Sequence, residues 1–261
     1  MTLPRLYAIV DVSCFGGDLR KVIAFAAELA TAGATLVQYR NKIGSSREIL
    51  SEGREMKRKL GSRTQFIMND RPDLCLGADF DGVHLGQDDI SVAGARKVLG
   101  QRKSIGLSTH NLAQFHDAAA TSADYLALGP IFATRSKQDP DPEVGLKTVT
   151  EARKVTSKPI VAIGPIFATR SKDRPDPIVG LDGLKEIRTT IRKPLVAIGG
   201  ITLANCRSVI DAGADSVATR PRRLPRSTVA ASRTRPAAAF PAPGPTRYAR
   251  RQSRAGLSAR A

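Results

Sequence analysis

Short apolar segments alternate with amphipathic segments along most of the chain, and this alternation constrains the fold more than any other feature. Several short segments, such as residues 125–128, are apolar throughout, as are strands of a parallel sheet covered on both faces. The clearest amphipathic segment, residues 18–31, begins at a capping aspartate and ends before Gly33, which predicts a helix. The strand candidates are residues 6–11, 35–40, 65–69, 82–85, 104–108, 125–128, 159–163, 194–198 and a short stub at 216–218.

Repeated strand–helix alternation predicts βα units with right-handed crossovers and therefore a parallel sheet. Two architectures fit this pattern, a (β/α)8 TIM barrel and an open doubly wound sheet. Polar motifs follow many different strands rather than one switch point, which favours the barrel. We therefore expect one TIM barrel over residues 1–218 of the 261-residue chain.

A tandem duplication complicates the strand count. Residues 129–163 align without a gap with residues 164–198, and 22 of the 35 positions are identical. Each copy spans a loop, a helix and the following strand, and a TIM barrel needs only eight strands. Either both copies enter the barrel as strands 7 and 8 with residues 216–218 outside, or one copy bulges out and the stub becomes strand 8. Expelling a copy would expose large aliphatic side chains, so we predict the first arrangement.

The segment at residues 219–261 has a different composition, with 11 Arg and 6 Pro but no Asp, Glu or Lys. It has too little apolar surface to offset its ordering entropy, so we expect a disordered tail. The tail carries most of the net charge of +17 and leaves +6 for the first 218 residues. An RNA-binding function would depend on this charge alone, without interleaved aromatic residues, and we expect no nucleic-acid partner.

The remaining composition favours a cytoplasmic protein without a membrane partner. No apolar run approaches the roughly 18 residues that span a bilayer, and the run at residues 6–10 is too short for a signal sequence. The three cysteines have no CxxC spacing, so neither a disulfide framework nor a zinc site is expected. The sequence leaves open whether the chain forms a homo-oligomer.

Polar side chains cluster where the predicted strands end. In a parallel barrel these ends meet at one mouth, where active sites lie. The segments concerned are residues 38–42, 69–71, 82–89 (which contains the fourth strand), 108–110 and 134–137. We therefore expect an active site at this mouth. We interpret His84 as lining the barrel and His110 as preceding the next helix.

The residue types at these strand ends suit phosphate chemistry. Asp70 and Asp89 offer the oxygen ligands that Mg²⁺ prefers. The cations Arg40, Lys42 and Lys137 can surround the same diphosphate, Arg as a fork and Lys as a point charge.

A heterocycle and a second phosphate could occupy the remaining positions. Gln38 and Asn69 offer amides that could orient a heterocycle, while Thr134 and Ser136 could hold a second phosphate together with the backbone around Gly199 and Gly200. Two phosphate sites and one metal indicate an alkyl diphosphate that meets a phosphorylated acceptor.

The motifs QYRNK, NDR, GVHLGQDD, GLSTH, GPIFATRSK and AIGGI, in this order within residues 3–218, closely resemble those of the thiamine-phosphate synthase family. The resemblance implies a transferase that joins hydroxymethylpyrimidine diphosphate to hydroxyethylthiazole phosphate, with Mg²⁺ as cofactor. It also implies a dissociative reaction, in which pyrophosphate leaves before the thiazole nitrogen attacks.

The resemblance further assigns roles to individual residues. It implies that Asp70 and Asp89 bind Mg²⁺ and that Ser108 contacts the pyrimidine. The implied ligands of the pyrimidine diphosphate are Gln38, Arg40, Lys42, Asn69 and Lys137, and those of the thiazole phosphate are Thr134, Ser136 and one glycine of Gly199-Gly200. Arg40, Lys42, Ser108 and Lys137 are the residues expected to act in catalysis.

Two departures from the family pattern stand at the end of the chain. The family follows its last strand with an Ile-Ser phosphate-binding turn and a helix, whereas this chain continues Ala218-Thr219-Arg220-Pro221. The duplication also offers a second candidate, Lys172, for the position of Lys137. These departures predict an incomplete thiazole-phosphate pocket and impaired activity. They also leave open an alternative, a non-catalytic barrel of the same family with a ligand-binding or regulatory role. The intact strand-end motifs favour the enzyme.

Overall fold

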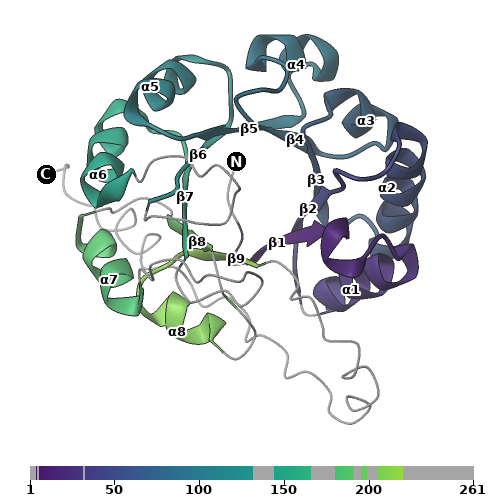
Figure 1. Cartoon of the computed structure of the whole chain (residues 1–261), viewed down its shortest axis with the longest axis horizontal. Helices are drawn as coiled ribbons and strands as arrows, with labels where there is room; N and C mark the ends of the chain where they lie inside the picture. The colour runs from purple at the N-terminus through teal and green to yellow at the C-terminus, as the bar shows by residue number, and fades with distance from the viewer. Residues whose placement is uncertain are drawn as a thin grey trace, which may run out of the picture.

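The computed structural model describes residues 4, 6–31, 33–131, 144–165, 180–190, 195–198, 201 and 205–219. Parallel strands form a closed barrel in the order of the chain, and helices surround it (Figure 1). The strands are β1 Leu6–Asp11, β2 Leu36–Arg40, β3 Gln65–Asn69, β4 Gly82–Leu85, β5 Ser104–Thr109, β6 Tyr125–Leu128, β7 Ile160–Pro165, β8 Leu195–Ile198 and β9 Ser216–Thr219. The helices are η1 Val12–Phe15, α1 Leu19–Thr31, α2 Ser46–Leu60, α3 Pro72–Gly77, α4 Val92–Leu99, α5 Leu112–Ala120, α6 Gly145–Val155, α7 Gly180–Thr190 and α8 Cys206–Asp211.

The predicted parallel barrel is confirmed, but the count of eight strands is wrong because nine strands close it. Both copies of the duplicated unit enter the barrel, as α6 with β7 and α7 with β8. The short strand β9, which we expected outside the barrel, pairs with β8 on one side and with β1 on the other. β9 therefore supplies the backbone pairing that closes the barrel between β8 and β1.

Local sequence signals explain where the helices begin. Ser45 and Glu48 form a reciprocal capping box at the start of α2, with the Glu48 carboxylate accepting the Ser45 N–H at 2.7 Å. Asn111 caps α5 by accepting the N–H of Gln114 at 2.8 Å. Each cap follows a strand end and its loop, so it fixes the direction in which the chain leaves the barrel mouth.

Apolar side chains form two cores, one between the strands and the helices and one inside the barrel. The inner core consists of Tyr7, Leu36, Ile67, Tyr125, Ala127, Val161, Val196 and Ala218. Two tyrosines are its largest members, and one of them needs a glycine beside it. A Cβ atom on Gly106 would lie 2.1 Å from Cζ of Tyr125. The absence of a side chain at Gly106 therefore lets the Tyr125 ring enter the barrel interior.

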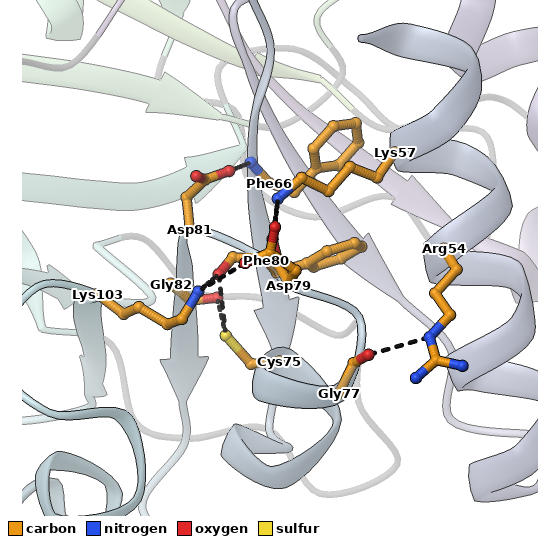
Figure 2. Close-up of polar contacts among 10 residues, drawn as sticks. All are labelled: Arg54, Lys57, Phe66, Cys75, Gly77, Asp79, Phe80, Asp81, Gly82 and Lys103. Atoms are coloured by element: carbon orange, nitrogen blue, oxygen red, sulfur yellow. Dashed lines mark hydrogen bonds and ion pairs between the residues drawn. The ribbon is translucent and has the colours of Figure 1, made fainter. Parts of the chain in front are cut away.

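The turn between α3 and β4, at the end of the barrel opposite the mouth, is held by charged side chains (Figure 2). Lys57 lies 2.8 Å from the carboxylate of Asp79, and Lys103 lies 3.4 Å from the same carboxylate. Lys103 also donates to the carbonyl oxygen of Phe80 at 2.5 Å. Cys75 is buried under this turn, and burial raises the pKa of its thiol to about 12, in keeping with a packing role.

Several predictions concern residues that the structure does not describe. The boundary predicted after residue 218 falls within β9, and the remainder of the expected disordered tail, residues 220–261, lies outside the described residues. Within the described part of the chain, no helix is long and apolar enough to cross a membrane.

Candidate active site

Side chains from β1 to β5 and from the loops after them converge at the mouth of the barrel. They include seven of the residues singled out from the sequence: Gln38, Arg40, Lys42, Asn69, Asp70, Asp89 and Ser108. The other five, Thr134, Ser136, Lys137, Gly199 and Gly200, lie outside the described residues, as does Lys172. The described part of the site is therefore the half that we expected to bind the pyrimidine diphosphate and a metal.

The carboxyl groups of Asp70 and Asp89 lie together, as expected from their positions after neighbouring strands. Lys42 Nζ lies 2.9 Å from Asp70 Oδ2, and the N–H of Gly86 donates to Asp89 Oδ2 at 2.7 Å. Burial raises the pKa of Asp89, and the adjacent carboxylate of Asp70 raises it further by charge repulsion and by a hydrogen bond. Two acidic groups held this close attract a cation.

The backbone places Asp70 in an unusual conformation. Its φ angle is 65°, in the left-handed region that residues other than glycine seldom adopt. Its N–H donates to the carbonyl oxygen of His84 at 2.8 Å, so the turn after β3 is tied to β4. This turn directs the Asp70 side chain toward the loop that carries Asp89.

The available carboxylate ligands suit Mg²⁺, which keeps several water ligands, better than they suit a metal ion coordinated entirely by protein side chains. Among the described residues, no cluster of three His, Cys, Asp or Glu side chains could hold a metal ion. Mg²⁺ commonly binds through one or two carboxylates and completes its octahedron with water and substrate phosphate oxygens. The pair of Asp70 and Asp89 matches that arrangement, and Lys42 lies beside it.

Arg40 is held at the mouth by a carboxylate that the sequence analysis missed. Arg40 Nη1 lies 2.6 Å from Asp11 Oδ2, and the Asp11 side chain is only 1% exposed. Asp11 also accepts from the backbone N–H and the hydroxyl of Ser13, which fixes its orientation. A signal was present in the sequence, because Asp11 ends the first strand just as Arg40 ends the second.

Gln38 and Ser108 lie deeper, where they contact buried residues of the barrel. Gln38 donates to the hydroxyl of Tyr7 at 3.2 Å, and Ser108 Oγ lies 2.9 Å from Nε2 of His84. Burial lowers the pKa of His84 to about 4, so its ring is neutral at pH 7. The interpretation of His84 as a residue that lines the barrel is confirmed. Asn69 lies beside it, in register with His84 on the neighbouring strand.

His110 has the structural role that we expected from its place before α5. Its backbone N–H donates to the side chain of Gln114 at 2.7 Å, and its Nδ1 lies 2.7 Å from the carbonyl oxygen of Gly129. These contacts tie the end of β5 to the start of α5 and to the end of β6.

Comparisons with known proteins agree with this geometry. A family described as "Thiamine monophosphate synthase" matches residues 6–166 and 162–221, two ranges that overlap within the duplicated segment. The chain is 50% identical over 220 residues to a thiamine-phosphate synthase from Koribacter versatilis, covering 84% of the chain and 88% of that relative. It is 36% identical over 202 residues to one from Methanosarcina barkeri, covering 77% and 76%.

Solved structures also resemble the barrel. A thiamine phosphate pyrophosphorylase from Pyrococcus furiosus superposes with a TM-score of 0.52 at 28% identity, covering 83% of this chain and 85% of that one. A geranylgeranylglyceryl phosphate synthase from Thermoplasma acidophilum reaches the same TM-score at 14% identity, with coverage of 83% and 85%. The second likeness concerns the fold alone.

Proposed function

Because the chain belongs to the thiamine monophosphate synthase family, we propose that it joins hydroxymethylpyrimidine diphosphate to hydroxyethylthiazole phosphate. The products are thiamine phosphate and pyrophosphate. The observation that carries the proposal is the convergence of Asp70, Asp89 and Lys42 at the barrel mouth. Such a cluster suits the binding of a diphosphate together with a divalent cation.

The reaction depends on stabilising the negative charge of the departing pyrophosphate, and it does not depend on a general base. The bond between the methylene carbon and the diphosphate oxygen breaks first, and the oxygen keeps the electron pair. The electron-rich aminopyrimidine stabilises the resulting cation, and the thiazole nitrogen then donates its lone pair to form the new C–N bond. No proton leaves the thiazole nitrogen, so the neutral ring of His84 is not required as a base.

The side chains at the mouth have distinct tasks in this reaction. Lys42 and Arg40 bind the departing diphosphate, and their pairing with Asp70 and Asp11 orients them before the substrate arrives. Bound between Asp70 and Asp89, Mg²⁺ would add positive charge at the same oxygens. Gln38, Asn69 and Ser108 hold the pyrimidine ring.

The altered end of the chain favours a second candidate, a non-catalytic barrel that retains ligand binding. The sequence after β9 reads Arg220-Pro221 in place of the phosphate-binding turn that the family resemblance leads us to expect. Such a barrel would bind the pyrimidine diphosphate through the described half of the site and would form no product. For either candidate we propose a cytoplasmic protein whose partners are small molecules, and the sequence leaves self-association open.

A pyrophosphate-release assay with both substrates and Mg²⁺ tests the proposal. Asp89→Asn should lower the rate by about 100-fold or more, because it removes charge from the proposed cation site. Asp88→Asn is the matched control, since Asp88 is exposed and stands next to Asp89. Equal rates for the two variants would contradict the proposed role of Asp89. Binding of the pyrimidine diphosphate without pyrophosphate release would favour the second candidate.

A further inference from the structure

Four hydrogen bonds in series cross the barrel interior and join Gln38 to Ser108. Gln38 Nε2 donates to Tyr7 Oη at 3.2 Å, and Tyr7 Oη lies 3.2 Å from Tyr125 Oη. Tyr125 Oη lies 3.0 Å from His84 Nδ1, whose other nitrogen, Nε2, lies 2.9 Å from Ser108 Oγ. These residues come from β1, β2, β4, β5 and β6, and β1 lies across the barrel from β6 (Figure 1). We call this series the interior chain.

Given that Gln38 donates to Tyr7, only one arrangement of the protons in the interior chain provides every buried donor with an acceptor. Tyr7 is 3% exposed and Tyr125 is 0% exposed, and each hydroxyl has a single proton. If Tyr125 donated to Tyr7, the Tyr7 proton would face no acceptor among the described residues. A buried donor without an acceptor is costly, so Tyr7 donates to Tyr125.

The same reasoning extends the direction to the far end of the interior chain. The Tyr125 hydroxyl donates a hydrogen bond to Nδ1 of His84, because a proton on Nδ1 would leave the buried Tyr125 hydroxyl without an acceptor. Because Nδ1 accepts from Tyr125, the N–H of the ring is on Nε2 and donates to Ser108 Oγ. The hydroxyl proton of Ser108 is then available to donate to a bound ligand, as is the second N–H of the Gln38 amide.

We propose that Tyr7 and Tyr125 are positioning residues, which fix the carbonyl of Gln38 as an acceptor and the hydroxyl of Ser108 as a donor toward the bound ring. This inference rests on the proposed function for the identity of the ring. An aminopyrimidine presents an N–H donor and a ring-nitrogen acceptor, which match these two groups. An oxo-substituted pyrimidine places an acceptor where the amino donor stood, and it would meet the Gln38 carbonyl unfavourably.

The first test reads the direction of the interior chain without substrate. Nitrogen-15 NMR of the full chain at pH 7 distinguishes the two neutral tautomers of each of its three histidines. The variants His110→Gln and His116→Gln identify the signals of the other two rings, so that those of His84 are known. We expect the Nε2–H tautomer for His84. An Nδ1–H tautomer, or a doubly protonated ring, would overturn the proposed direction.

The second test measures the selectivity that the interior chain confers. Calorimetry compares binding of hydroxymethylpyrimidine diphosphate with binding of the analogue in which oxo replaces amino. Tyr7→Phe removes only the hydroxyl, and we expect the preference for the amino compound to fall by about 10-fold, the equivalent of one buried hydrogen bond. Tyr39→Phe is the matched control, because Tyr39 is a buried tyrosine on β2 whose hydroxyl bonds to Glu52 instead of the interior chain.

The outcomes separate this inference from the proposed function. A wild-type chain that binds neither pyrimidine would contradict the proposed function, while the His84 tautomer would still decide the direction of the interior chain. A wild-type chain with the expected preference that Tyr7→Phe leaves unchanged would refute the positioning role. An equal loss of preference in Tyr39→Phe would refute it as well, because general destabilisation would then account for both variants.

Discussion

Arg153 and Arg188 hold the same position in the two copies of the duplicated unit, in the last turns of α6 and α7, but their contacts differ. Arg188 donates from Nε to the carbonyl oxygen of Gly213 at 2.5 Å and forms an ion pair with Asp215. Arg153 donates from Nη1 to the carbonyl oxygen of Lys158 at 2.9 Å. Its Nε and Nη2 are buried with no partner among the described residues.

The strand order explains this difference. Asp215 stands directly before β9, and Asp124 holds the equivalent place before β6, where it pairs with Arg96 of α4 at 2.9 Å. In both pairs the arginine lies on a helix, and the carboxylate stands directly before the second of the two strands that follow this helix in the chain. For Arg153 that strand is β8, and Pro194 stands before it. The second copy of the unit therefore separates Arg153 from the carboxylate that its counterpart uses.

Replacing each arginine with methionine should have unequal effects on the free energy of unfolding. Arg188→Met loses a hydrogen bond from a charged donor, about 1.5–3 kcal/mol, and a part-exposed ion pair of about 0–1 kcal/mol. We therefore expect a loss of about 2 kcal/mol. Arg153→Met also loses one such bond, but it removes two buried unsatisfied donors that each cost about 1–3 kcal/mol. We expect it to match the wild type within about 1 kcal/mol or to exceed it.

Urea denaturation of both variants and the wild type measures this difference. Each variant removes one positive charge and keeps most of the apolar stem, so the pair controls for charge and packing. The midpoint should fall for Arg188→Met and stay or rise for Arg153→Met, with unchanged slopes. A loss in Arg153→Met as large as that in Arg188→Met would refute the reasoning.

Three further predictions follow from other contacts. Gly106→Ala should lower the melting temperature and weaken pyrimidine binding, because its Cβ would displace the Tyr125 ring; calorimetry showing neither effect would contradict the packing. Two lysines lower the pKa of Asp79, so this carboxylate stabilises the fold above its unfolded pKa of about 4 and the contribution is lost as the pH falls through the lower folded pKa. Melting curves between about pH 6 and 3 should therefore depend less on pH in Asp79→Asn than in the wild type. Cys75 should react with a thiol reagent at pH 8 only on unfolding, since burial raises its pKa to about 12. Peptide mapping that finds Cys75 itself rapidly labelled in the native chain would contradict this, whereas labelling of the partly exposed Cys14 would not.

The strands were predictable from the sequence because nearly all of them are short runs of buried apolar residues bounded by polar or glycine positions. The prediction for β6, residues 125–128, matches the observed strand, and the predicted 159–163 became Ile160–Pro165. The strand count was wrong for a physical reason. Local pattern shows that a segment can form a strand, but closure of the barrel depends on backbone pairing between β9 and the distant strand β1.

The site was predictable where one residue type points to one chemistry. Strand ends with Asp70 and Asp89 predicted a pair of carboxylates at the mouth, and the pair is present. Asp11 was missed because a lone acidic residue after a strand resembles a solvated loop, and its pairing with Arg40 depends on the neighbouring strand. The interior chain was beyond prediction, since it depends on which faces of β1 and β6 turn inward and meet.

The most direct test of the proposed function is the product balance of the full chain with both substrates and Mg²⁺. Mass spectrometry measures thiamine phosphate, and a coupled assay measures pyrophosphate in the same reaction. The proposed function requires the two products in equal amounts, and neither product when the thiazole phosphate is omitted. Tight binding of the pyrimidine diphosphate with no thiamine phosphate formed would contradict it and would identify the chain as a binding barrel.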